Sequence, residues 1–161
     1  SFGMTALASP REPMAHVTFV VPENGDELSS LNLDWMQDQI LHGGESFWCA
    51  GAGQGWISHT AQTQLLLTYS ELHGFYPEFV DRRGTYWKPL NPRLDCIKVP
   101  VWICGVPIIV SSQFFISRVK MWLAVEEFCQ TGNRKDGIPW VLKKTIGWSY
   151  DWEDHPDVVI K

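Results

Sequence analysis

Histidines are the residues of this sequence best suited to acid–base chemistry, because an imidazole titrates near neutral pH. None of the five stands at a spacing that places two metal ligands on one face of a helix or strand. His59 and His73, with Asp81 near them in the chain, have the residue types of a small hydrolase site. Such a site is defined by geometry in the folded chain. The hydrolase is therefore an alternative, and surface or structural histidines are the favoured interpretation.

A glycine-rich stretch, Gly51–Trp56, invites comparison with a phosphate-binding loop. It lacks the Gly-Lys-Ser/Thr ending of such a loop, and the pattern after it does not indicate a helix. The stretch therefore predicts a turn between strands. The four cysteines form no close pair of the kind that binds structural zinc, so we expect free thiols, no metal and no cofactor.

Two groups of acidic residues are candidates for contact with a partner. Carboxylates stand beside aromatic residues near the C-terminus, and a second group surrounds an expected turn near the N-terminus. Aromatic side chains supply desolvated contact area, and the charges supply steering and orientation. A solvated terminus explains the C-terminal group equally well. The candidate partner-binding residues are Trp148, Tyr150, Asp151, Trp152, Glu153 and Asp154, together with Glu23, Asp26 and Glu27.

The overall charge and composition narrow the classes of partner. The net charge is −5, from 13 Lys+Arg and 18 Asp+Glu, which disfavours direct binding to nucleic acid and suits a basic protein partner. No apolar run is long enough to span a membrane, and no signal peptide is evident, so we expect a cytoplasmic protein. The 161 residues suit a single domain, 1–161, in which 1–3 are an expression remnant and 150–161 an acidic aromatic tail.

Hydrophobic periodicity predicts the elements that position these residues. Helices are expected from a cap at Ser29 or Ser30 through Leu41, and over Gln113–Gln130. The fold class is therefore α+β, a mainly antiparallel sheet packed by one long C-terminal helix and a shorter N-terminal helix. The expected strands are Ala15–Val21, Glu45–Ala50, Thr63–Tyr69, a hairpin of Gly74–Val80 and Thr85–Lys88, edge strands or a connector at Ile97–Cys104 and Val106–Val110, and closing strands at Ile138–Leu142 and Lys144–Trp148.

One charged residue conflicts with this pattern. Arg118 falls on the apolar face of the long helix. It is expected either to extend its guanidinium to solvent, the favoured interpretation, or to pair with a buried carboxylate.

A segment of about a fifth of the chain resembles a known family. It contains Val106-Pro107, Ala124-Val125-Glu126-Glu127-Phe128, Thr131-Gly132-Asn133-Arg134 and Ile138-Pro139-Trp140. This order resembles the bacterial polymorphic-toxin immunity proteins that accompany nucleic-acid deaminase toxins. The family usually has proline directly after the arginine, whereas this chain has Lys135-Asp136-Gly137 and then Pro139.

The resemblance implies an α+β protein, not an enzyme, that binds a cognate toxin domain and blocks its active site. It transfers no catalytic residues, and it implies structural roles for Phe128, Gly132 and Trp140. The toxin expected is a nucleic-acid deaminase or nuclease, and such an enzyme is typically basic. The alternatives are the small hydrolase and a non-enzymatic ligand-binding domain that uses a tryptophan-rich surface.

Overall fold

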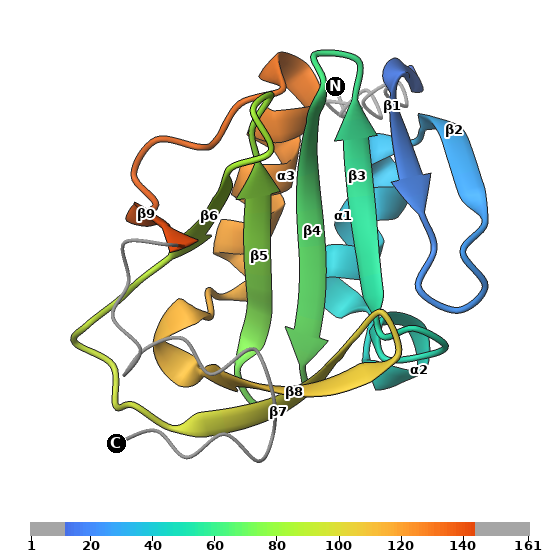
Figure 1. The fold of residues 1–161 in the computed structure, drawn as a ribbon. Helices are drawn as coiled ribbons and strands as arrows, with labels where there is room; N and C mark the ends of the chain where they lie inside the picture. The colour runs from blue at the N-terminus through green and yellow to red at the C-terminus, as the bar shows by residue number, and fades with distance from the viewer. Residues whose placement is uncertain (1–11, 144–161) are drawn as a thin grey trace, which may run out of the picture.

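A seven-stranded antiparallel sheet forms the centre of the computed structural model, which describes residues 12–143 (Figure 1). The fold is α+β, as the sequence predicts. The strands lie in the order β2-β1-β3-β4-β5-β6-β9, and every neighbouring pair is antiparallel. Their bounds are Met14–Val20 (β1), Glu27–Leu31 (β2), Gln54–His59 (β3), Thr63–Ser70 (β4), Gly74–Val80 (β5), Tyr86–Pro89 (β6) and Trp140–Leu142 (β9).

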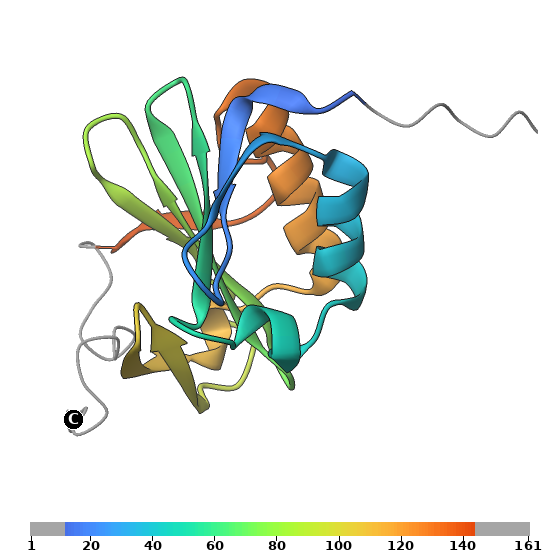
Figure 2. The same cartoon turned by 90° about the vertical axis from the view of Figure 1, so that its right-hand side faces the viewer.

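Helices cover one face of this sheet (Figure 2). They are α1 (Leu33–His42), the single-turn α2 (Glu45–Trp48) and α3 (Arg118–Thr131). Because side chains alternate along a strand, Leu65 and Leu67 of β4 face the helices and are buried. They belong to the main core, in which Phe128 is also buried, as the family resemblance implies.

The C-terminal helix is shorter than predicted, with 14 residues, and it begins at Arg118 rather than at Gln113. The reason is a tertiary contact, since Ile116 and Phe75 exchange two backbone hydrogen bonds that hold residue 116 extended. Ser117 then caps α3 by accepting a hydrogen bond from the Lys120 amide. Gly132 ends the helix in a left-handed conformation, as expected.

Two predictions in the N-terminal third are wrong. Asn32, not Ser29 or Ser30, caps the first helix, because Glu27–Leu31 pairs with β1 as an edge strand. Glu45–Ala50 was expected to be a strand, but its first residues form α2. Trp48 of α2 is fully buried in the core and donates from its indole nitrogen to the Gln39 carbonyl, which favours the helical turn.

The glycine-rich stretch forms a turn, as predicted, but the turn joins helix α2 to β3 and does not join two strands. Gly53 has a φ of +77°, and a Cβ there would lie 2.6 Å from the Cβ of Trp102. The amide of Gly105 also donates to the Ala52 carbonyl. The glycines therefore let the tip of another hairpin approach the backbone closely.

That hairpin consists of β7 (Lys98–Ile103) and β8 (Val106–Ser111), a separate two-stranded sheet. It crosses one end of the sheet face that carries no helix (Figures 1 and 2). Val99, Val101 and Val110 pack there with Tyr76, Phe114 and Phe115 in a second core. Both strands are edges, which is why Pro100 and Pro107 are tolerated.

The last strand is shorter than expected, since β9 covers Trp140–Leu142, and the strand predicted at Lys144–Trp148 lies outside the described residues. No helix within residues 12–143 has the length and hydrophobicity needed to cross a membrane.

Arg118 adopts neither of its two expected arrangements. Its Nη1 donates to the carbonyls of Ile40 and Gly43 at 3.0 and 2.6 Å, and its Nη2 donates to the Tyr69 hydroxyl. The guanidinium therefore satisfies carbonyls at the C-terminal end of α1 and ties the two long helices together.

Candidate functional site

The three residues of the hydrolase alternative do not come together. His59 and Asp81 lie at one end of the β3–β4–β5 meander, whereas His73 lies in the β4–β5 turn at the other end. The eight residues of β4 separate these ends by roughly 25 Å. Asp81 also has a structural role, because it accepts hydrogen bonds from the amides of Arg83 and Thr85 and from the Trp87 indole.

His59 is held by contacts within the fold. Its Nδ1 accepts a hydrogen bond from the Ala61 amide, so the proton of the neutral ring is on Nε2. That Nε2 is buried and has no hydrogen-bond partner among the described residues. Burial lowers the pKa of His59, and the nearby His16 lowers it further. A buried donor of this kind is unsuited to accept a proton from a substrate.

The cysteines are free thiols, as predicted. Burial raises the pKa of Cys129 to about 12, which keeps this thiol protonated and unreactive. Residues 12–143 contain no group of three or more His, Cys, Asp or Glu side chains placed to hold a metal ion.

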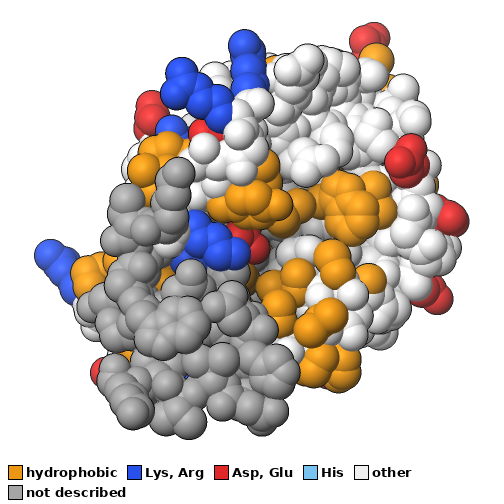
Figure 3. Space-filling view, viewed as in Figure 1, with side chains coloured by type: hydrophobic (Ala, Val, Ile, Leu, Met, Phe, Trp, Pro, Cys, Tyr) orange, Lys and Arg blue, Asp and Glu red, His pale blue; other side chains and the backbone are white. Residues whose placement is uncertain are grey.

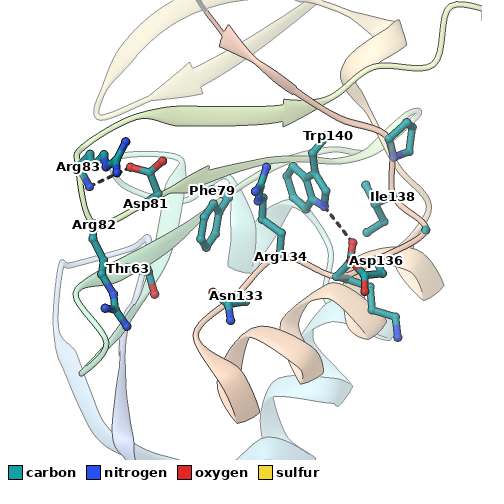
Figure 4. Close-up of a pocket in the computed structure, with 13 residues that line it drawn as sticks. Thr63, Phe79, Asp81, Arg82, Arg83, Asn133, Arg134, Asp136, Ile138 and Trp140 are labelled. Carbon is teal, nitrogen blue, oxygen red and sulfur yellow. Dashed lines mark hydrogen bonds between the residues drawn. The ribbon is translucent and has the colours of Figure 1, made fainter.

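A cleft of about 820 Å³ lies between the β5–β6 turn and the segment that links α3 to β9 (Figure 4). We call it the basic cleft, because Arg82 and Arg83 come from the first wall, and Arg134 and Lys135 from the second. Asp81 and Asp136 are its two carboxylates, which leaves an excess of two positive charges. The ligand-binding alternative calls for apolar walls instead.

Aromatic rings hold Arg134 in place at the cleft. The centre of its guanidinium lies 3.7 Å from the centroid of the Trp87 ring and 5.5 Å from that of Phe79. A guanidinium stacked face-on keeps its N–H groups free to bind acceptors in its own plane. Trp140, which also lines the cleft, donates from its indole to the Lys135 carbonyl and so fixes the loop between them.

A second hollow lies on the sheet face that carries no helix. We call it the open-face groove, and its volume is about 420 Å³. Figure 3 shows hydrophobic side chains gathered across the middle of this face. The groove runs between the strands and the tip of the β7–β8 hairpin. Its lining residues are Gln54, Leu66, Glu78, Tyr86, Ile103, Cys104, Ile108 and Lys143.

The charges of the open-face groove are paired within the chain. Glu78 is almost fully buried, and its Oε2 lies 3.4 Å from the Nζ of Lys143. Lys88, one strand away on β6, is also buried, with its Nζ 4.0 Å from the centroid of the Phe114 ring. The groove thus combines apolar walls with an internally paired carboxylate.

The three predicted partner-binding residues that the structure describes lie away from both hollows. Glu23, Asp26 and Glu27 are exposed at the β1–β2 turn, on neither the groove nor the cleft. The other six candidates, Trp148, Tyr150, Asp151, Trp152, Glu153 and Asp154, are outside the described residues.

Sequence reasoning missed both hollows. For the groove, the signal in the sequence was the alternation that places Leu66, Glu78 and Tyr86 on one face of the sheet. For the cleft, it was the adjacent Arg82 and Arg83 in a predicted turn.

No family model, curated protein or solved structure matches this chain. The resemblance to immunity proteins therefore rests on the residues from Val106 to Trp140 alone. Within this segment, every residue from Asn133 to Trp140 lines the basic cleft, and Ile108 lines the open-face groove.

Proposed function

We propose that this chain is an immunity protein that binds a cognate toxin domain acting on nucleic acid, a deaminase or a nuclease, and blocks its active site. The observation that carries the proposal is the open-face groove. Leu66, Tyr86, Ile103 and Ile108 present apolar surface there on a sheet face that no described helix covers.

Exposed apolar side chains beside the groove extend this contact surface. Tyr86, which lines the groove, is 40% exposed, and Val106, which pairs with the groove residue Ile103, is 52% exposed. Aromatic and aliphatic side chains of this kind supply most of the free energy of binding at protein interfaces once water is excluded around them. A large contact of this type suits a stoichiometric inhibitor.

The charge of the chain suits the partner that the resemblance implies. A domain that acts on nucleic acid carries a basic surface to neutralise phosphates. The net charge of −5 on this chain steers such a domain into contact, and the apolar surface then holds it. The inhibitor would act in the cytoplasm, where the toxin meets its nucleic acid.

The test is co-expression with the toxin encoded by the neighbouring gene, with cell survival and co-purification as readouts. The native chain is expected to protect the cells and to co-purify in a 1:1 complex. Leu66→Asp, which places a carboxylate in the groove, is expected to abolish both. The matched control is Leu72→Asp, because Leu72 is 89% exposed in the β4–β5 turn, away from the groove.

Thermal unfolding of both variants separates a binding defect from a folding defect. Tyr86→Ala, at a 40% exposed position, is a second groove variant that disturbs the core less. A native chain that neither protects cells nor binds the toxin would contradict the proposed function. Full protection by a folded Leu66→Asp variant would show that the groove is not the contact surface.

A further inference from the structure

We propose that the basic cleft receives an acidic segment of the partner protein, an inference that rests on the proposed function and adds a second contact to it. The segment presents at least two carboxylates, one for each wall. The cleft then orients the partner, while the open-face groove supplies most of the affinity.

The first support is that cations of the cleft lack partners within the described chain. Neither hydrogen bonds nor ion pairs join the side chains of Arg82, Arg134 and Lys135 to any residue of 12–143. The guanidinium of Arg134 lies over the rings of Trp87 and Phe79. Within the described residues, these three side chains therefore carry positive charge that no carboxylate pairs.

The second support is the arrangement of the two walls. Arg82 and Arg83 come from the β5–β6 turn, while Arg134 and Lys135 follow α3, so both walls of the hollow contribute cations (Figure 4). An arginine binds a carboxylate through two parallel hydrogen bonds. A hollow of about 820 Å³ has room for several residues of an extended segment.

The composition of the walls favours a peptide over a phosphate group or a nucleic acid. No helix N-terminus among the described residues lines the cleft. Phosphate sites instead collect backbone amides at a helix N-terminus. Phe79, Ile138 and Trp140 offer apolar contact to side chains that flank carboxylates. Arginine and tryptophan are also enriched at the centres of protein interfaces.

The position of the cleft explains why a second contact of opposite charge is useful. Tyr86 of β6 lines the groove, and the adjacent Trp87 contacts Arg134 of the cleft. The two hollows therefore lie on either side of one strand. A basic partner attracted by net charge alone binds in many orientations. One acidic segment that fits only this cleft selects a single orientation.

The experiment measures the affinity of the full chain for the toxin at low and high salt. Arg82→Glu/Arg83→Glu changes exposed residues of the turn, and Arg134→Gln removes the stacked cation without reversing its charge. Arg93→Glu is the matched control, since Arg93 is exposed and does not line the cleft. We expect the double variant to weaken binding about 100-fold at low salt, and the control less than about 3-fold.

The outcomes separate this inference from the proposed function. If the native chain does not bind the toxin, the proposed function fails and the inference fails with it. If the native chain binds tightly and both cleft variants bind as tightly, only the inference is overturned.

Carbodiimide cross-linking gives an independent readout, because it joins a lysine amine to a carboxylate it touches. We expect mass spectrometry of the complex to find Lys135 linked to an aspartate or glutamate of the toxin. A single-stranded oligonucleotide that binds the native chain, and not the cleft variants, would overturn the assignment in favour of nucleic acid.

Discussion

The two hollows on either side of β6 differ in how their charges are satisfied. In the open-face groove, Glu78 is buried and paired with Lys143 of the same chain. In the basic cleft, Arg82 is exposed, and neither it nor Arg134 is paired with a described residue. Charges of the first kind hold the fold together, whereas charges of the second kind are available to a partner. Mutation of Glu78 should therefore lower the stability of the fold, whereas mutation of Arg82 should weaken toxin binding and leave the stability almost unchanged.

The largest expected effect on stability is at the buried carboxylate of the groove. Glu78→Ala removes a buried carboxylate together with its ion pair to Lys143. We expect the free energy of unfolding to fall by about 3 kcal/mol, as measured by urea denaturation. A loss below about 0.5 kcal/mol would show that Glu78 is not structural, and the contrast between the two regions would then disappear.

A smaller effect is expected where the cleft meets the core. Arg134→Ala removes a guanidinium stacked on Trp87, and such half-buried contacts contribute about 1 kcal/mol. We expect a loss of that size in urea denaturation. Arg134→Lys keeps the charge but loses the flat stacking surface, so it should recover only part of the loss. Full recovery with lysine would indicate that charge alone matters there.

The exposed arginines of the turn are expected to contribute almost nothing to stability. Arg82→Ala should change the free energy of unfolding by less than about 0.5 kcal/mol, because its side chain has no hydrogen bond or ion pair to a described residue. If Arg82→Glu/Arg83→Glu also loses toxin binding, as expected, this outcome would identify Arg82 as a binding residue. A clear destabilisation would assign it to the fold instead.

The smallest expected effect is on the titration of Asp81, which anchors the turn beside the cleft. The hydrogen bond from the Trp87 indole is the main cause that lowers the pKa of Asp81. A lowered folded pKa stabilises the protein above the pKa of the unfolded chain, and this contribution is lost as the pH falls through the folded value.

Trp87→Phe keeps an aromatic surface for Arg134 but removes the indole donor. Its expected result is an Asp81 pKa closer to the ordinary value, as followed by NMR titration of the carboxyl carbon. An unchanged pKa would assign the shift to the backbone amides of Arg83 and Thr85 instead.

Local patterns in the sequence predicted the elements that depend on neighbouring residues. Thr63–Tyr69 contains a continuous leucine run, and the two segments after it bracket a short turn, so β4, β5 and β6 lie close to where the sequence places them. The start of α3 was missed because Phe75, distant in sequence, decides it, and the helical turn at Glu45 was missed because its Trp48 bonds to Gln39 of another helix. Local propensity contains no information about such partners.

The hollows were beyond prediction for a similar reason. The basic cleft joins residues near 82 to residues near 134, which meet only because β6 pairs with β9 and α3 packs on the sheet. The groove depends on the β7–β8 hairpin folding back over β4. The positions of the carboxylates in the sequence pointed to acidic clusters, whereas the described surface also contains a basic region whose Arg82 and Arg134 have no ion pair to a described residue.

The most direct test of the central claim is calorimetric titration of the purified chain with the toxin domain at several temperatures. The account predicts a 1:1 complex with a dissociation constant in the nanomolar range or below, on the order of −12 kcal/mol. It also predicts a negative heat-capacity change from buried apolar surface and a large loss of affinity in Leu66→Asp. A native chain that gives no binding heat at any of these temperatures, and no complex on gel filtration, would contradict the account.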